Sequence, residues 1–570
     1  MSRAKQVCVG VAAAGLFGLG TTVATAVATA DTGNSNAGAS SSSAKASSAN
    51  PGPKARTRAQ AETRRTPAAV SQPASATRKS AARTTTSPAA EALSVTSALS
   101  SAPGASSTAA SSPASSAVPT GIGRSRRGAV ITATASAAAA AGGGQVTALA
   151  DGVPQHVLLI GIDGTNLSAI LADPYNQNLF GLMQGGTTGA ASMMGHTTIS
   201  DPSWSGITTG VWSEVLGLTN NVFTPWTYDK YPTIFNQLET YLPNVNTSVI
   251  ADWANIAQIG GAGSIPADKI LYYPQINNSW LDTDDEVGVA STNEILNTAA
   301  GTPSFQFSYF VGVDDTGHEF NAGSPQYAAA LRNVDDNVGA MLNAVNDWET
   351  ANPGEKWTVL VVTDHGQVPW NTLGIYGTQM RAHGFQTPYE TTAFVIANGP
   401  DFTAGAVNNT YLNIDIAPTV SKLFGLTPEP YSQGKPLMDR AINDYQPVDP
   451  SPDALRKSLQ DAIAMYGYPD VATNIALQVR TLASFIPYFV YAAFDGLTAD
   501  MAPGPLKLAI QFVGAVLYQA VNIPTQIIVR LTGVTGNQII PPDLWPYTPV
   551  PGTQTEPPVP ANQSAEAIAV

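Results

Sequence analysis

Cysteine is almost absent from this chain, since Cys8 is the only one among its 570 residues. It lies in a segment with a basic start (MSRAKQ), an apolar run and small residues ending at Ala30, which is the pattern of a secretory signal peptide. A lipoprotein is excluded because its cysteine would stand at the cleavage point, whereas an uncleaved membrane anchor is the alternative. We therefore expect residues 1–30 to be a signal peptide. The mature chain would then lack disulfide bonds and thiol chemistry, and it would be secreted or held in a bacterial cell envelope.

Positive charge is also scarce, with 27 Lys and Arg against 41 Asp and Glu, for a formal net charge of −14. An acidic chain repels phosphate backbones, so nucleic-acid binding is not expected. Large apolar residues are nearly missing from residues 31–150, which consist mainly of Ser, Ala, Thr, Pro and Gly. Such a segment cannot bury enough surface to offset its chain entropy, so we predict a disordered, mildly basic stalk. It would act as a spacer or attach to anionic polymers of a cell wall.

Short apolar runs appear from Gln155 onward and alternate with helical patterns such as Gln326–Trp348. Apolar strands that alternate with helices predict a mostly parallel sheet covered on both faces. We therefore predict an α/β three-layer sandwich, formed as one domain over residues 151–447. The predicted strands are HVLLIGID, NTSVIAD, FSYFVGVD, WTVLVVTD and TAFVIANGP.

Aspartate and histidine gather at the ends of these strands. In open α/β sheets the carboxyl ends of parallel strands meet at one edge, where ligands bind. Any one of these residues could be a helix cap or a structural side chain, but three of the five histidines follow the pattern. The other two, His156 and His196, lack it and are interpreted as structural. The residues at strand ends are Asp163 in IGIDG, Asp314 and His318 in VDDTGH, Asp364 and His365 in VVTDHG, and His383 in RAHG.

These three aspartates and three histidines exceed what one tetrahedral zinc needs, so they predict two divalent metal ions. Imidazole and carboxylate together favour Zn²⁺, or else Mn²⁺ or Fe, over Ca²⁺ and Mg²⁺. Two metals about 4 Å apart can stabilise the attacking and leaving oxygens of a phosphoryl displacement. A nucleophile would complete such a site.

Ser200 is the candidate nucleophile. It precedes Asp201 and Pro202 in HTTISDPSWSG, and a proline at this point predicts the start of a helix. Backbone N–H groups at a helix N-terminus favour a phosphate, although an ordinary N-cap serine is the alternative. No histidine stands directly beside Ser200 in the sequence to act as a base. Coordination to a metal would remove that need, because it activates the hydroxyl.

The order of these motifs resembles the type I phosphodiesterase/nucleotide pyrophosphatase family of the alkaline phosphatase superfamily. IGIDG is similar to its first metal-binding strand, TTISDPSWSGITTG to its nucleophile block, DDTGH to its D-x-x-G-H motif, TDHG to its S-D-H-G motif and RAHG to a late H-G. The similarity covers about residues 153–438. It implies an alkaline phosphatase-like fold and an exported, metal-dependent hydrolase of phosphate esters, mainly phosphodiesters, that passes through a phosphoserine.

The resemblance also assigns the metal ligands and the catalytic groups. Asn221 falls where the family has an asparagine that binds a phosphoryl oxygen, so Ser200 and Asn221 are the implied catalytic residues. One implied metal site comprises Asp314, His318 and His383, and the other comprises Asp163, Asp364, His365 and Ser200.

Departures from the family pattern leave the substrate open. The family usually has threonine where Ser200 stands and then an aromatic residue, where this chain has Asp201. It also has Asn-His where this chain has Ser203 and Trp204. Nucleotides, lipid head groups and cell-wall phosphodiesters are therefore all candidate substrates.

Two other functions fit the same residues. SDPSW is similar to the sulfatase signature, Ser or Cys followed by x-P-S-R, but Trp204 replaces the arginine. A catalytically inert envelope-binding protein is the other alternative. Metal content separates an inert protein from an enzyme, and bound Ca²⁺ would indicate a sulfatase. Trp226 and Tyr228 could line a leaving-group pocket, with packing as their alternative role.

Helical runs after residue 447 predict a helical appendage over residues 448–540 that packs on the preceding domain. No run reaches the ~20 clean apolar residues of a membrane span. Because Leu506–Val521 is amphipathic, association with a membrane surface is the alternative. Residues 541–570 form a Pro-rich tail that is predicted to be extended. The helical runs are Ser451–Tyr466, Leu482–Leu497 and Leu506–Val521.

Overall fold

The computed structural model describes residues 155–373, 379–380, 383–441, 451–536, 547 and 549–554. The predicted signal peptide and stalk lie outside these residues, as does most of the predicted Pro-rich tail. Those three expectations therefore stay predictions.

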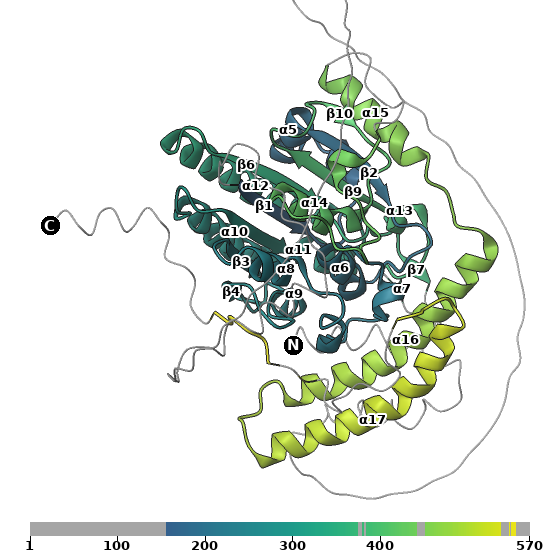
Figure 1. Ribbon diagram of the computed structural model, residues 1–570. Helices are drawn as coiled ribbons and strands as arrows, with labels where there is room; N and C mark the ends of the chain where they lie inside the picture. Colours follow the sequence, from purple (N-terminus) through teal and green to yellow (C-terminus); the bar gives the residue numbers. More distant parts are fainter. Residues whose placement is uncertain are drawn as a thin grey trace, which may run out of the picture. The chain divides into compact units, whose positions relative to one another are not determined.

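A sheet of eight strands forms the centre of the domain, in the order β10-β2-β9-β6-β1-β5-β3-β4 (Figure 1). Neighbouring strands are parallel except at β9, which runs antiparallel to both β2 and β6. The strands are β1 (Gln155–Ile162), β2 (Thr187–Ser192), β3 (Asn246–Ala251), β4 (Lys269–Tyr272), β5 (Ser304–Phe310), β6 (Lys356–Val362), β9 (Thr392–Asn398) and β10 (Ala406–Val407). A separate small sheet pairs β7 (Thr372–Leu373) with β8 (Gln379–Met380). The predicted mostly parallel α/β sheet is confirmed.

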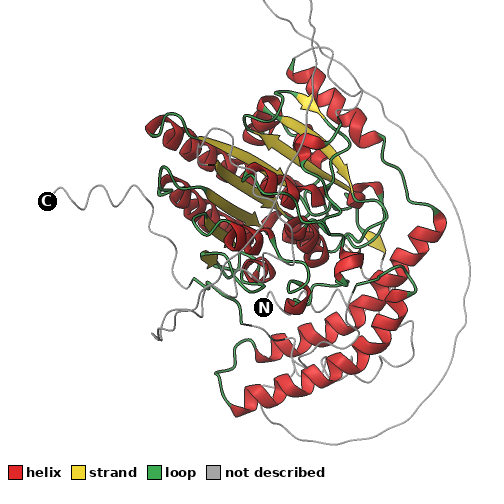
Figure 2. Ribbon diagram, viewed as in Figure 1, coloured by secondary structure: helices red, strands yellow, loops and turns green. Residues whose placement is uncertain are grey.

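Helices cover both faces of this sheet, because alternate side chains of each strand face opposite sides (Figure 2). On β1, Leu158 and Ile160 join one buried core while Val157 and Leu159 join the other. The first core is covered by α4 (Leu167–Ala172), α5 (Gln177–Gly185), α10 (Trp280–Leu296), α12 (Pro325–Ala351) and α15 (Pro452–Ala464). The second is covered by α6 (Ser200–Thr209), α8 (Ile234–Tyr241), α9 (Ala254–Gly260) and α14 (Ile416–Leu423). The three-layer sandwich is thereby confirmed.

Shorter helices connect these layers, and two long ones follow them. The short helices are α7 (Ser213–Leu216), α11 (Gly312–Phe320) and α13 (Pro388–Thr391). The long ones are α16 (Val471–Thr498) and α17 (Pro505–Arg530). Both exceed the predicted runs, because Pro487 and Pro524 lie inside them instead of ending them. By length and composition alone α16 and α17 could each cross a membrane, although polar residues interrupt the apolar run in both helices.

Glu214 attaches the α16–α17 pair to the sandwich. Its Oε1 accepts a hydrogen bond from Arg480 of α16 at 2.5 Å, and its Oε2 contacts His196 Nδ1 at 3.0 Å. Its backbone carbonyl accepts from the N–H groups of Thr535 and Gly536, which follow α17. Burial would raise the pKa of Glu214, but the hydrogen bond and charge of His196 and the charge of Arg480 lower it to about 2. The folded protein therefore favours the ionised carboxylate.

Acidification is expected to loosen this attachment. A folded pKa of about 2 lies below the ordinary 4.5, so the Glu214 contribution is complete above about pH 4.5 and is lost as pH falls towards 2. The shift corresponds to about 3 kcal/mol of unfolding free energy. Glu214→Gln should therefore flatten the dependence of the urea midpoint on pH between 5 and 3. Asp461→Asn, in the exposed Lys457–Asp461 pair, is the control and should keep the wild-type slope; equal slopes in both variants would reject the role.

Candidate metal centre

The six predicted ligands converge at one edge of the sheet. Asp163 directly follows β1, and Asp364 comes two residues after β6, its parallel neighbour. Asp314 lies on α11, which begins just after β5. His383 precedes β9, and because β9 is antiparallel its beginning lies at the edge where the parallel strands end. Four separate segments of the chain therefore supply this cluster.

Asp163, Asp364 and His365 form one group. The His365 Nε2 atom lies 3.1 Å from Asp364 Oδ2 and 3.6 Å from Asp163 Oδ1. Both of these carboxylate oxygens are buried and have no hydrogen-bond partner among the described residues. A buried oxygen without a partner is costly. Its presence beside an imidazole nitrogen fits a bound cation.

Asp314, His318 and His383 form the second group. His318 Nε2 lies 3.1 Å from Asp314 Oδ2 and 3.1 Å from His383 Nε2. His383 Nε2 is also 3.7 Å from Asp314 Oδ1. Ligand atoms of Asp314, His365 and His383 lie within 4.8 Å of one another as well. His365 therefore stands between the two groups, whereas the resemblance assigned it to one metal alone.

The surroundings orient these ligands. The Nδ1 atoms of His365 and His383 lie 3.2 Å and 2.5 Å from the carbonyl oxygens of Gly366 and Thr198. Nδ1–H groups that donate to carbonyls leave the Nε2 lone pairs facing the cluster, as metal ligation requires. The backbone N–H of Gly164 donates to Asp364 Oδ1 at 3.2 Å. The opposite oxygen of that carboxylate is thereby left to a metal.

Burial shapes the charge of the cluster. It raises the pKa of Asp163 to about 8, with the nearby charge of Asp314 adding to the effect. It lowers the pKa of His383 to about 4 and that of His365 well below its ordinary value. Both imidazoles are thus neutral at pH 7, with lone pairs available. Clustered buried carboxylates need positive charge nearby, and divalent cations would supply it.

Asp314 and His318, which the sequence placed just past the end of a strand, lie on the helix α11. They stand four residues apart on α11, so both side chains face the same side. Asp252 and Asp284, which the sequence analysis missed, hold the beginning of this helix. Their Oδ1 atoms accept from the N–H groups of Val311 at 3.0 Å and Gly312 at 3.1 Å. Burial raises the pKa of both carboxyl groups, to about 7 for Asp284.

Ser200 begins α6 and is buried beside the first group. Its Oγ lies 3.2 Å from His365 Nε2, so the fold supplies the neighbouring histidine that the local sequence lacks. Asn221 lies next to it, because its Oδ1 accepts from the backbone N–H of Asp201 at 2.9 Å. Asn255 Nδ2 holds this arrangement by donating to the Asn221 carbonyl and to Asp201 Oδ1, both at 3.1 Å. The two predicted catalytic residues therefore lie at one helix N-terminus.

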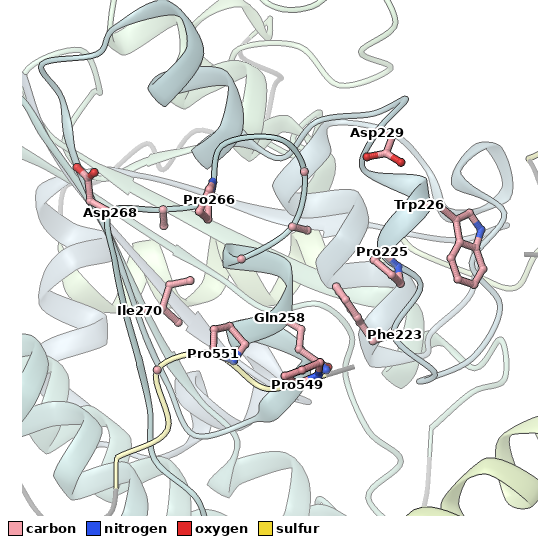
Figure 3. Close-up of a pocket in the computed structure, with 15 residues that line it drawn as sticks. Phe223, Pro225, Trp226, Asp229, Gln258, Pro266, Asp268, Ile270, Pro549 and Pro551 are labelled. Carbon is pink, nitrogen blue, oxygen red and sulfur yellow. The ribbon is translucent and has the colours of Figure 1, made fainter. Parts of the chain in front are cut away.

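Trp226 and Tyr228 do not lie at the metal centre. The Tyr228 hydroxyl is buried against Ser205 Oγ at 2.8 Å, which is a packing role. Trp226 lines a separate hollow of about 750 Å³, opposite Pro549 and Pro551 (Figure 3). None of the ligand residues lines that hollow. The expectation of a leaving-group pocket here has no support.

Trp204 has a role that the sequence analysis missed. Its Nε1–H donates to Asp163 Oδ2 at 2.9 Å, and the Tyr309 hydroxyl donates to the same oxygen. The sequence gives no sign of this role, because a tryptophan does not reveal its hydrogen-bond partner. Tyr309 lies inside the FSYF strand, where only the alternation of side chains between the two faces of the sheet could have indicated that it points towards Asp163. Together they fix one oxygen of Asp163 and leave the other for a metal.

Trp204→Phe is expected to weaken zinc binding about 10–100-fold, because it removes a hydrogen bond that orients a ligand. Competition with a chromogenic zinc chelator would measure the change. Trp357→Phe is the matched control, since that buried indole nitrogen has no partner among the described residues. Unchanged zinc affinity in Trp204→Phe, or an equal loss in the control, would count against the orienting role.

Comparison with known proteins agrees with this geometry. Residues 157–413 match the family model of type I phosphodiesterase/nucleotide pyrophosphatase, a range that holds all the predicted ligands, Ser200 and Asn221. No curated protein matches the chain. Similar solved structures include murine ectonucleotide pyrophosphatase/phosphodiesterase 5, at 16% identity and a TM-score of 0.41, over 50% of this chain and 99% of that one.

Two further structures extend the comparison. A 2-O GAG sulfatase shows 13% identity and a TM-score of 0.39, over 52% of this chain and 76% of that one. A protein of the alkaline phosphatase superfamily from Vibrio parahaemolyticus shows 15% identity and a TM-score of 0.35, over 51% and 72%. The family match and the ordered motifs lead to one assignment. Residues 157–413 match the model of the type I phosphodiesterase/nucleotide pyrophosphatase family, so this part of the chain is similar to a family of metal-dependent hydrolases.

Proposed function

We propose that the protein is an exported phosphodiesterase with two divalent metal ions, Zn²⁺ being the best candidate, and Ser200 as its nucleophile. The observation that carries the proposal is the pair of buried, unpartnered oxygens, Asp163 Oδ1 and Asp364 Oδ2, around His365. The Ser200 hydroxyl lies 3.2 Å from the same imidazole. When bound, the metals would supply positive charge that lowers the pKa of the serine hydroxyl and offsets charge on the phosphoryl oxygens.

The chain's own groups carry the two chemical steps. Ser200 Oγ forms a bond to phosphorus, the bond from phosphorus to the leaving oxygen breaks, and the alcohol departs with the serine proton. Water then attacks the phosphoserine, which releases a phosphate monoester and restores the hydroxyl. Asn221 would donate from Nδ2 to a non-bridging oxygen, since its Oδ1 is already held by the Asp201 N–H.

Diesters should be preferred over monoesters. A monoester dianion carries more charge, and enzymes that favour it add a cation, often a bidentate arginine. Within the described residues, Arg332 pairs with Asp173 and Arg480 with Glu214, while Arg440 pairs with Asp415. Arg456 Nη1 donates to the Leu171 carbonyl, and Arg530 Nη2 donates to the Gly536 carbonyl. The neutral amide of Asn221 therefore suits a diester.

We expect a higher kcat/KM for aryl phosphodiesters than for monoesters with the same leaving group. Asn221→Ala should lower kcat/KM for the diester by the equivalent of about 2–4 kcal/mol, the effect of losing one preorganised donor. Assays with paired aryl esters and added Zn²⁺ or Mn²⁺ would measure both quantities. A monoester preference would contradict the proposal and direct attention to Arg381, which lies outside the described residues.

Aryl sulfates in the same assay test the sulfatase alternative. At the position of the sulfatase arginine, Trp204 is buried and donates to Asp163, so it adds no cation to the site. We therefore expect little sulfate-ester hydrolysis. If protein that contains two zinc ions hydrolyses none of these esters, the result would favour the inert envelope-binding alternative.

A further inference from the structure

The α16–α17 pair buries several polar side chains and leaves an apolar side exposed. On α17 the buried side chains include Gln519, Asn522, Thr525 and Gln526. Gln526 Nε2 bonds Asn522 Oδ1 at 3.2 Å, and Thr525 Oγ1 bonds the Ala483 carbonyl of α16 at 3.3 Å. A helix pair in water normally buries its apolar face and exposes its polar one. The reversed arrangement requires an apolar environment on the outside.

The exposed face of α17 carries no charge along most of its length. We call this surface the apolar face. Every exposed residue between Lys507 and Arg530 is apolar. Its members are Leu508, Ala509, Phe512, Val513, Val516, Leu517, Ala520, Pro524, Ile527 and Ile528.

A second feature extends the apolar face to the start of α16. A hollow of about 430 Å³ opens there, lined mainly by Ile475, Val479, Ile528 and Leu531. Val479 is 42% exposed and Leu531 is 84% exposed. The apolar surface therefore continues from one helix to the other, and contiguous exposed apolar patches mark sites of interaction.

We propose that the apolar face docks on the surface of a lipid bilayer. Lys507 and Arg530 bracket the face, and their separation along the helix is roughly 34 Å. Cations at both ends complement the anionic phosphates of lipid head groups, while the uncharged stretch between them fits the acyl boundary. A protein partner would be expected to meet a polar rim along this surface. The exposed side of α17 between its two cations offers none.

The pair lies on the bilayer and does not span it. Thr481 Oγ1 of α16 donates to the Gly384 carbonyl at 2.7 Å, and the Ser484 carbonyl accepts from Asn220 at 3.0 Å. These bonds hold the first half of α16 against the sandwich. On α16, only the stretch from about residue 486 to Asp495 is then free of both the sandwich and charge, and α17 is held along the first half of the same helix, since Thr525 bonds the Ala483 carbonyl. At 1.5 Å per residue the free stretch of α16 reaches roughly 14 Å, less than half of a ~30 Å hydrocarbon core.

The same contacts connect the docking surface to the candidate metal centre. Gly384 directly follows His383, so α16 touches the segment that carries a predicted ligand. Docking through α17 would therefore hold that centre close to the lipid surface. The docking proposal itself stands without the proposed hydrolase function, because it depends on the helices alone.

Flotation of the full-length protein with vesicles tests the proposal. The probe is a vesicle of equal parts phosphatidylglycerol and phosphatidylcholine, with pure phosphatidylcholine for comparison. The test variant is Val516→Gln with Leu517→Gln, whose positions are 46% and 45% exposed. The control is Ile265→Gln with Leu296→Gln, at 40% and 41% exposed on the sandwich. Residues 1–30 are present in both variants, so any contribution that they make to vesicle binding is the same and does not affect the comparison.

We expect wild-type protein and the control to float with the mixed vesicles. The Val516/Leu517 variant should lose at least tenfold in vesicle-bound fraction, and all three proteins should hydrolyse a soluble diester equally. Failure of the wild type to float, or equal losses in both variants, would overturn the docking proposal. Neither result would bear on the proposed phosphodiesterase function. A dimer in light scattering that only the Val516/Leu517 variant dissociates, without flotation, would assign the face to a second copy. Resistance to alkaline carbonate extraction would overturn the surface placement in favour of spanning.

Discussion

Changing His318 or Asp364 to alanine is expected to abolish nearly all hydrolysis, and each change should lower the metal content from two ions per chain towards one. The two residues belong to different groups: His318 Nε2 lies 3.1 Å from Asp314 Oδ2, and Asp364 Oδ2 lies 3.1 Å from His365 Nε2. Each variant therefore removes a ligand from a different ion. Loss of either ion removes charge stabilisation from one of the two oxygens exchanged at phosphorus.

Elemental analysis of purified protein, after refilling with zinc, would measure this effect together with diester hydrolysis. His156→Gln is the control, because His156 bonds Ser304 and Glu355 at the opposite end of β1. It should keep both metals and most of the activity. Wild-type protein that holds only Ca²⁺, or no metal after zinc refilling, would reject the two-metal proposal. Melting curves of each variant would separate ligand loss from unfolding.

Much of the fold could be predicted because large apolar residues mark its central strands. β1 and β6 contain near-continuous apolar runs, β5 alternates aromatic residues with Ser and Gln, and a predicted ligand follows each strand within four residues, at the edge where the site forms. The strand β2 was not predicted, because Thr187–Ser192 contains no large apolar residue. The chain needs small residues there, since a Cβ at Gly189 would come within 2.3 Å of the Asn408 carbonyl oxygen. Periodicity cannot reveal a strand whose neighbours leave no room for side chains.

The ligands of the candidate site could be predicted, but the groups that orient them could not. Asp314 and His318 are four residues apart, and that spacing indicates a shared ion in a loop as well as in a helix. By contrast, Trp204 and Tyr309 act on Asp163 across 41 and 146 residues of sequence. Such hydrogen bonds depend on how α6 and β5 pack against β1, which no local pattern records.

The C-terminal helices show a different limit. Proline lacks the N–H that an internal helix position donates, so Pro487 by itself predicts a break in the helical run. Within α16 it is buried and the helix continues through it, since neighbouring turns maintain the helix on either side. Sequence patterning also could not tell which face of α17 points outward. The amphipathic period is the same for a helix whose polar side is buried and for one whose polar side is exposed.

Ser200→Ala is expected to lower the rate of diester hydrolysis by several orders of magnitude while both metals stay bound. The hydroxyl is the group that would attack phosphorus, and its Oγ lies 3.2 Å from His365 Nε2 at the N-terminus of α6. The metals should remain because three predicted ligand side chains would hold each of them without the serine. If Ser200 were only a helix cap, Ser200→Ala would lower stability and leave the rate largely unchanged. The structure shows no capping bond from a side chain at the start of α6.

Ser200→Thr separates the nucleophile from a merely structural hydroxyl. Threonine offers the same attacking oxygen, and the family uses it at this position, so substantial activity should remain. Rapid acid quenching during turnover, followed by mass spectrometry, should find the phosphoryl group on residue 200 in the wild type and the Thr variant. It should be missing from the Ala variant. Near-wild-type turnover of Ser200→Ala with both metals bound would reject Ser200 as the nucleophile, because the attack on phosphorus would then proceed without its hydroxyl.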